Sequence, residues 1–314
     1  MKAYIAAASA AALSVGLVVA APTMADVFSF STGNPDGKLG SLSQPPGPGS
    51  VETETADDFG LTDATVISRA TVHGLIASGL VVSDIKQVEV EVYHVFPEDS
   101  DTTRTPAVVT RVNSPADIEI GAATRDSGAS PATLRFKTIL VKKSFMVLNT
   151  VVNKINPAPH QFTGGEGPAT GDEVEIDITF TPPIFLPAGQ YFFRPEVQVS
   201  GGFLYLSAPK PIVSPGTPFP AGFTDLQSWI RNAKLKPDWS RIGADITHQG
   251  PFNAGFSLAG DTIPGAGTPG QPNCHGKTIS ATAHEFGGIK HAALSLGFFS
   301  VDALQNGVSK FCQP

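Results

Sequence analysis

Hydrophobic and polar residues alternate most clearly over Glu173–Gln198. The first part has a period of two, which predicts a strand with one buried and one solvated face. The Pro/Gly-rich stretch Thr181–Gly189 predicts a turn, and a second strand follows from Gln190. Because two half-buried strands need a second apolar layer to cover them, the segment predicts a β-sandwich. The buried face of the first strand is predicted to consist of Val174, Ile176, Ile178 and Phe180.

Further strands are predicted on both sides of this segment. Leu134–Leu140 and Phe145–Ile155 are predicted to form a hairpin, and the acidic stretch Val51–Phe59 suits an edge strand. One or two helical turns are predicted at Asp225–Arg231. About nine to eleven strands at this spacing are typical of an antiparallel sandwich or jelly roll. The remaining predicted strands are Asp26–Phe30, Val66–Ile76, Val88–Phe96, a short one near Val108–Val112, Phe203–Ser207, Arg241–Ile246 and Phe252–Leu258.

The pattern changes to a helical period after Cys274. Three helices are predicted, each ending near a glycine or at the end of the module: Ile279–Phe286, Ile289–Leu296 and Val301–Phe311. Ser300 is the predicted N-cap of the last helix. A helical module of about 40 residues is too small to hold a strong core alone.

The N-terminus predicts export. Lys2 precedes an apolar run, Ala3–Ala21, and small residues follow at Thr23 and Ala25, which is typical of a signal peptide. A membrane anchor is the alternative, but the run is Ala-rich and has no basic residues after it. No later stretch is long enough to span a bilayer, so a secreted or periplasmic protein is expected. The predicted organisation is a signal peptide at 1–25, a sandwich domain at 26–262, a Pro/Gly linker at 263–273 and the helical module at 274–314.

Composition narrows the class of partner. The chain has 32 Gly and 27 Pro among 314 residues, which favours turns over long helices. The formal net charge of −7 argues against nucleic acid or an anionic membrane, because both need a cationic face. The glycines at 265, 267 and 270 match a dinucleotide-binding pattern, but prolines flank them, so no such cofactor is expected.

The two cysteines, Cys274 and Cys312, bracket the helical module. In an exported protein such a pair predicts a disulfide, which stabilises a loop of this length by about 4 kcal/mol in the chain-entropy treatment. The rival interpretation is a metal site that uses Cys274 with His275, His284 and His291. Gly287 and Gly288 lie between the last two histidines and are expected to break a shared helix.

The adjacent carboxylates Asp57 and Asp58 are the predicted candidates for a metal site. Neighbouring residues of a strand point to opposite faces, so one of the two is expected to point inward or lie at the rim. A buried carboxylate needs an arginine or a hard cation, and Ca²⁺ is the candidate cation. The alternative is an ordinary loop or edge-strand position.

Aromatic residues gather in the last third of the sandwich domain. Exposed rings on a sheet face stack on sugars, whereas large aromatic rings are more often part of a core. Trp229 shares a face with Leu226 and Ile230, which predicts a core position. Trp239 and Tyr205 are the candidate ligand-binding residues.

Several short stretches look familiar together: T-E-T-A-D-D-F, V-F-P-E-D-S, R-V-N-S-P, P-G-T-P-F and L-K-P-D-W-S-R-I-G-A-D-I. They resemble a family of bacterial exported proteins of unassigned function over Val51 to Gly260. The stretch from Asn273 to Cys312 resembles a short cysteine-bracketed tail of various exported bacterial proteins. These motifs imply no catalytic residues for this chain.

The sequence therefore predicts a secreted, non-catalytic β-sandwich protein that binds an extracellular glycan or surface protein. One alternative is a secreted hydrolase with a site in the polar loops Glu98–Ser130 and His160–Gly171, and another is a structural surface-layer or matrix component that self-assembles. A hydrolase would bring two or three members of one set into a single cleft. That set is His94, Asp99, Arg104, Arg111, Asp117, Arg125 and His160.

Overall fold

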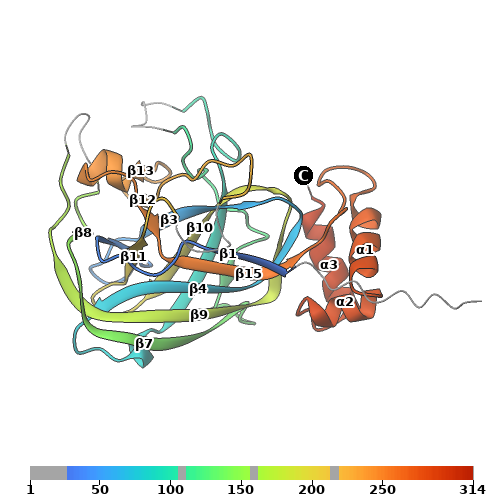
Figure 1. The fold of residues 1–314 in the computed structure, drawn as a ribbon, viewed down its shortest axis with the longest axis horizontal. Coiled ribbons are helices and arrows are strands. Elements are labelled where there is room, and N and C mark those ends of the chain that lie inside the picture. Colours follow the sequence, from blue (N-terminus) through green and yellow to red (C-terminus); the bar gives the residue numbers. More distant parts are fainter. Residues whose placement is uncertain (1–26, 105–110, 156–161, 213–218, 314) are drawn as a thin grey trace, which may run out of the picture.

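A computed structural model describes residues 27–104, 111–155, 162–212 and 219–313. Figure 1 shows a body of two sheets with three helices at one end. The predicted mainly β class, with a sandwich-like body and a C-terminal helical module, is confirmed. The predicted signal peptide, 1–25, lies outside the described residues.

The larger sheet has nine strands, and every described pairing in it is antiparallel except that of β2 (Leu39–Leu42) with β8 (Asn149–Val151). Two long strands extend it, because β9 (Ala169–Leu186) pairs with both β4 (Thr65–Ala77) and β7 (Leu134–Val147). β14 (Asn253–Ala254) pairs with β11 (Leu204–Ala208). The main path runs β1 (Val27–Ser31), β15 (Phe256–Thr262), β4 (Thr65–Ala77), β11 (Leu204–Ala208), β2 (Leu39–Leu42), β8 (Asn149–Val151).

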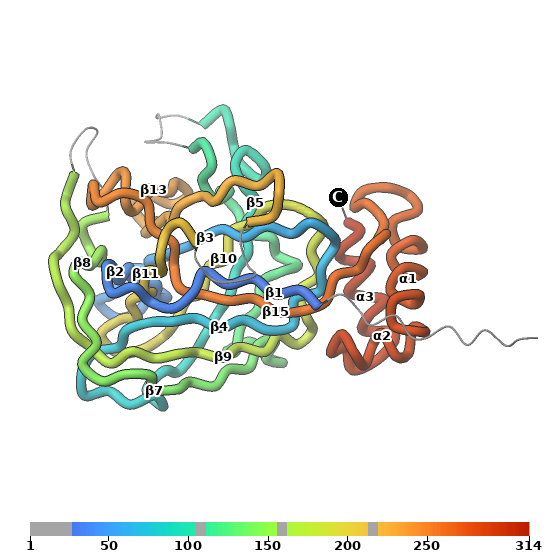
Figure 2. The backbone as a smooth tube through the Cα atoms, in the orientation of Figure 1, coloured from blue at the N-terminus to red at the C-terminus, as the bar shows by residue number. Residues whose placement is uncertain are grey.

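The smaller sheet has six strands and covers the inner face of the first. Its order is β13 (Ser240–Arg241), β12 (Trp229–Asn232), β3 (Thr53–Leu61), β10 (Gly189–Gln198), β5 (Gln87–His94), β6 (Arg125–Asp126). Figure 2 shows β4, β9 and β7 following one another along one side of the body, with β3 and β10 on the other.

The main core lies between the two sheets and follows the predicted alternation. The apolar face of β9 is buried, and all four residues predicted for it belong to the core. Val88, Val90 and Val92 of β5 face it from the smaller sheet. Removing these branched side chains from water is the main driving force for bringing the two sheets together.

The two strands of the Glu173–Gln198 segment belong to different sheets. β9 does not end at the Pro/Gly-rich stretch as predicted but continues through Pro182 and Pro183 to Leu186. It passes the prolines at a break in its pairing with β4, where the register shifts between Ile67 and Arg69. Proline is tolerated at such a bulge because no ladder hydrogen bond is required from its nitrogen.

Two predictions about neighbouring strands were wrong. Leu134–Val147 is one strand that pairs with β9, with register shifts near Lys142, and not half of a hairpin. β3 is an interior strand between β12 and β10, although its acidic sequence suggested an edge. Its carboxylates are accommodated because each has a partner from another segment, as described below.

Two further segments differ from the sequence prediction. Trp229–Asn232 forms β12 and pairs with β3, so the predicted helical turn there was wrong. Residues Ile242–Thr247 form a π-helix where a closing strand was predicted. The strand predicted near Val108–Val112 falls mainly on residues outside the described ranges. A short 3₁₀-helix, Val82–Asp84, precedes β5.

The helical module consists of α1 (Cys274–Glu285), α2 (Ile289–Ser295) and α3 (Val301–Phe311). A disulfide joins Cys274 and Cys312, whose Cα atoms are 5.7 Å apart, so the predicted bridge is confirmed and Cys274 is not a metal ligand. Ser300 caps α3 as predicted, accepting a hydrogen bond from the Ala303 amide at 3.0 Å. None of the described helices combines the length and apolar character needed to cross a membrane.

Candidate functional site

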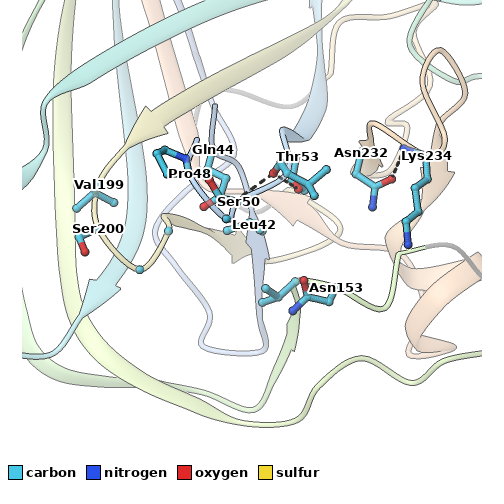
Figure 3. A pocket seen from close by; sticks show the side chains of 15 residues that line it. Leu42, Gln44, Pro48, Ser50, Thr53, Asn153, Val199, Ser200, Asn232 and Lys234 are labelled. Carbon is cyan, nitrogen blue, oxygen red and sulfur yellow. Dashed lines mark hydrogen bonds between the residues drawn. The ribbon is translucent and has the colours of Figure 1, made fainter. Parts of the chain in front are cut away.

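An open cleft lies at the end of the body where β2, β8 and β11 are labelled in Figure 2, away from the helical module. We call it the end cleft. Its volume is about 520 Å³, and four stretches line it: parts of 42–53, 152–153, 199–202 and 232–234. Figure 3 shows Val199 and Ser200 on one side, Asn232 and Lys234 on the other, and Asn153 below.

The β2–β3 connection forms one wall of the end cleft, and its shape follows from its sequence. Gln44 pairs with Thr53, and Gly47 pairs with Ser50, so the Q-P-P-G-P-G stretch folds into a short ladder closed by a turn. Gly49 has φ of +80°, a conformation that favours glycine. The turn therefore holds the Ser50 side chain at the cleft.

The β10–β11 loop forms the facing wall and approaches the first one closely. A Cβ added at Gly202 would lie 2.8 Å from Leu42 Cδ1 and 2.9 Å from Gln44 Oε1. Both atoms are the ends of side chains that would have to shift, and the φ of +84° at Gly202 is a conformation that favours glycine. The close approach fixes Val199 and Ser200 relative to the β2–β3 connection.

Polar groups of the end cleft fall into two kinds. Gln44 and Asn232 are held in place: Gln44 Nε2 donates to Val51 O at 3.2 Å, and Asn232 Oδ1 accepts from the Lys234 amide at 3.0 Å. The side chains of Asn153, Ser200 and Lys234 have no hydrogen-bond or ion-pair partner among the described residues. These three groups are therefore available to a ligand.

The electrostatics of the end cleft are simple. Lys234 is the one ionisable side chain in the described lining. The neighbouring Lys236 is paired with Glu52 at 3.5 Å. The described lining of the end cleft contains no pair of a general acid and a general base, which the hydrolysis of most polymers requires. The cleft offers amide and hydroxyl groups and one cation.

The two aromatic residues predicted to bind a ligand are both buried. Trp239 is 2% exposed, donates from Nε1 to Ala116 O at 3.1 Å and packs edge-on against Tyr93. Tyr205 is 1% exposed within the main core. A ring must expose a face to stack on a sugar, so the structure corrects this interpretation for both residues. The predicted core position of Trp229 is confirmed at 1% exposure.

Asp57 and Asp58 are buried on opposite faces of β3. Asp57 Oδ2 accepts from the Ala254 amide at 2.6 Å, whereas Asp58 Oδ2 accepts from Gln190 Nε2 at 2.6 Å. Burial raises the pKa of Asp57 well above its ordinary value and that of Asp58 to about 7. Two carboxylates on opposite faces do not fit one shared calcium ion, which takes six to eight oxygen ligands. Among the residues that the structure describes, no group of three or more His, Cys, Asp or Glu side chains is arranged to hold a metal.

A cluster of charged residues is buried on the outer face of the smaller sheet. Arg194 of β10 is central: its guanidinium lies 2.9 Å from Glu91, 3.1 Å from Glu196 and 3.6 Å from Glu54. Arg231 of β12 donates from Nε to Glu54 at 2.7 Å. Arg194 and Glu54 are 2% and 1% exposed, so the cluster is closed to a ligand, and it joins the four strands β3, β5, β10 and β12.

The pKa values of this cluster differ from one carboxyl to the next. Burial raises the pKa of Glu54, but the charges of Arg194 and Arg231 outweigh burial and hold it below its ordinary value. Burial raises the pKa of Glu196 to about 7, although Arg194 acts against the rise. The cluster has two guanidiniums for four carboxyls, so not every carboxyl has a guanidinium of its own beside it. The four carboxyls are those of Glu54, Glu89, Glu91 and Glu196.

The residues predicted for a hydrolase meet in two separate places. His94 Nδ1 lies 2.5 Å from Asp99 Oδ2, but Nε2 faces Glu98 at 3.5 Å. In a catalytic triad the second nitrogen faces a hydroxyl nucleophile, and here it faces a carboxylate.

The second meeting place joins two arginines with two aspartates. Arg111 Nη2 lies 2.5 Å from Asp117 Oδ1, and Arg104 lies 3.6 Å from the same oxygen and pairs with Asp238. These charges balance and tie the loop after β5 to the segment before Trp239. Neither this network nor the His94 pair belongs to the end cleft, Arg125 lies elsewhere, and His160 is outside the described residues.

No family model, curated protein or solved structure matches the chain. The resemblance to exported bacterial proteins therefore stays a prediction. The class that the fold defines is a two-sheet β-sandwich with a disulfide-closed helical module. The residues of the end cleft come from four separate segments, and only the Q-P-P-G-P-G loop carried a visible signal in the sequence.

Proposed function

We propose that the protein is a secreted, non-catalytic binding protein whose end cleft takes an extracellular glycan. The observation that carries this proposal is the set of unpartnered amide, hydroxyl and ammonium groups of Asn153, Ser200 and Lys234 around one cleft. Sugar hydroxyls both donate and accept hydrogen bonds, and amide and hydroxyl side chains do the same. The volume lies in the roughly 300–1,000 Å³ range of small-molecule sites.

The described lining contains no aromatic ring, so recognition would not depend on stacking. Val51, Val152 and Val199 would instead contact the apolar faces of a sugar ring. A site that relies on a few exposed hydrogen bonds binds weakly. We expect a dissociation constant of roughly 0.1–1 mM, or about −4 to −5.5 kcal/mol.

A glycan array tests the proposal, with mature protein from Asp26 onward applied in the presence and absence of EDTA. We expect binding to a subset of glycans that EDTA does not change. Loss of binding in EDTA would show a cation requirement that the geometry of Asp57 and Asp58 does not account for. Binding to no glycan would overturn the glycan proposal in favour of a surface protein as ligand.

Variants assign the binding to the end cleft. Ser200→Trp places a large ring in the cleft and should abolish binding, whereas Lys234→Gln should weaken it by about 5-fold, or roughly 1 kcal/mol. Lys277→Gln is the matched control. Lys277 is an exposed lysine of α1, so this variant should bind the glycan like the unaltered protein. Full binding by Ser200→Trp would place the site elsewhere. The hydrolase and structural alternatives stay predictions, to be tested with glycan substrates and by gel filtration.

A further inference from the structure

A second cavity lies where the helical module meets the sandwich, and we call it the junction groove. Its volume is about 170 Å³. Ala122, Pro182 and Pro183 of the body form one wall, and residues 303–311 of α3 supply the other. Phe185 of β9 and Phe311 of α3 stack at 4.3 Å between centroids and join the two parts. Phe299 also lines the groove and is 77% exposed.

The groove is open because the helix presents small side chains to it. Ala303 and Gly307 lie one turn apart on α3. A Cβ at Gly307 would lie 3.0 Å from Phe298 Cε1, so the glycine also lets Phe298 pack closely against the helix. A cavity of about 150 Å³ lined by apolar groups holds a benzene ring. The junction groove therefore has room for one aromatic ring or a short acyl chain.

Two cations lie beside this apolar space. Arg125 is 7% exposed, and its guanidinium donates only to backbone carbonyls: Pro182 at 2.7 Å, Pro183 at 2.8 Å, Thr124 at 2.8 Å and Ala122 at 2.9 Å. Four of its five N–H groups are used, and one on Nη2 has no partner in the part of the chain that the structure describes. Burial alone lowers the pKa of Arg125 to about 10, which agrees with a buried cation that has no carboxylate nearby.

The second cation is Lys310, an exposed residue in the last turn of α3. It has no ion-pair partner among the described residues, and the described lining of the groove contains no carboxylate. Two uncompensated cations at one cavity are unusual in a chain whose net charge is −7. An anion that binds beside them would be attracted by both.

We propose that the junction groove binds a small free carboxylic acid with an apolar body. The ring or chain packs against Phe185, Phe299 and Phe311, and the carboxylate accepts hydrogen bonds from Lys310 and the free N–H of Arg125. Charge-assisted hydrogen bonds of this kind are the stronger ones. The limited volume favours a single free acid over an extended peptide. This site is independent of the end cleft.

Titration of the mature protein with 3-phenylpropionate, followed by amide NMR shifts, tests the proposal. We expect saturable shifts at Phe299, Ala303, Asn306 and Lys310, and at least 5-fold weaker binding of the uncharged 3-phenylpropanol. Equal affinity for acid and alcohol would overturn the role of the cations. Shifts confined to other regions, or no shifts, would overturn the site itself.

Two variants and one alternative ligand complete the test. Lys310→Gln should weaken binding of the acid by about 5-fold and leave the alcohol unchanged, whereas the control Lys277→Gln should change neither. Ala303→Phe fills the groove and should abolish binding; unchanged helix signals in circular dichroism would show that the module still folds. If Lys310→Gln binds the acid normally, the proposal fails.

If a short peptide ending in phenylalanine binds at least 10-fold more tightly than the free acid, the occupant is a peptide C-terminus and the free-acid proposal is overturned.

Discussion

The sandwich body and the helical module differ in how far apart in sequence their contacting residues lie. In the body, Gln190 of β10 donates to Asp58 of β3, 132 positions away, and β12 reaches β3 from still further along the chain. The helices α1–α3 pack from one continuous stretch closed by the disulfide. The body therefore depends on partners that no local pattern reveals, whereas the module depends on local periodicity and one covalent bond.

The two parts also differ in what holds them together. The body has a broad apolar core between its sheets and, outside the smaller sheet, a buried charge cluster around Arg194. The module has a small core that includes Leu304 and Val308, and this core packs against Phe185 of the body. Removing one charged group should therefore damage the body most, and removing the disulfide should damage the module most.

The largest expected effect is that of Arg194→Met in the body. The change leaves Glu54, Glu91 and Glu196 without their shared cation, and breaking a buried ion pair in this way costs about 3–5 kcal/mol. Urea unfolding followed by fluorescence of the buried Trp229 and Trp239 measures the loss. Arg135→Met is the control, because Arg135 is exposed on β7 and should change the free energy of unfolding by less than about 0.5 kcal/mol. Equal effects of the two variants would contradict a structural role for the cluster.

The next effect separates the module from the body. The double variant Cys274→Ala/Cys312→Ala removes the disulfide that closes the module. The chain-entropy treatment gives this constraint a stabilisation of about 4 kcal/mol, and engineered disulfides often stabilise by less than that treatment predicts. Hydrogen exchange should show faster opening of α3, with the amides of β4 little changed. Equal acceleration in β4 would mean that the module and the body unfold as one unit.

The pH dependence of stability tests the buried carboxyls of the body. Burial raises the pKa of Asp58 and Glu196 to about 7, so the folded state binds these protons more tightly than the unfolded state does. The resulting stabilisation is complete below the unfolded pKa, near 4, and is lost as the pH rises through 7. We expect the free energy of unfolding to be lower at pH 8 than at pH 5 by a few kcal/mol. Glu196→Gln should reduce this difference in the free energy of unfolding. If the variant shows the same difference as the unaltered protein, groups other than Glu196 cause the pH dependence.

The smallest expected effect concerns the cap of α3. Ser300→Ala removes the hydrogen bond to the Ala303 amide and should cost about 1 kcal/mol, confined to the module. Hydrogen exchange of the first turn of α3 measures it. Ser309→Ala is the comparison, since its hydroxyl bonds only to Gln305 O within the helix and its loss should cost less. A Ser300→Ala protein with unaltered exchange would show that the packing of α3, and not its cap, fixes the start of the helix.

The same contrast explains which predictions succeeded. The presence of three helices, the Ser300 cap and the disulfide were predicted correctly, because a period of 3.6, a capping residue and two cysteines are local signals. The predicted start of the first helix was wrong, because α1 begins at Cys274 and not at Ile279. Leu226, Trp229 and Ile230 have a helical spacing, yet Trp229–Asn232 is a strand, because pairing with β3 satisfies its backbone and buries Trp229. Local propensity was outweighed there by a non-local partner.

Tertiary structure also decided the role of each candidate site residue. Trp239 is buried because Arg231 packs over its ring at 4.4 Å and Ala116 accepts its N–H. Neither contact is visible from the residues around position 239. The end cleft and the junction groove are likewise made by segments that meet only after folding.

The sequence by itself determined that most of the chain forms half-buried strands, that three helices follow the Pro/Gly linker, and which cysteines pair. These features depend on neighbouring residues, whose spacing fixes the face each side chain occupies. Only the tertiary structure decided that β9 and β10 lie in opposite sheets, that β3 is interior and that two cavities form at the two ends of the body. Strand pairing joins residues far apart in the chain, and the pattern of one strand does not specify its partner.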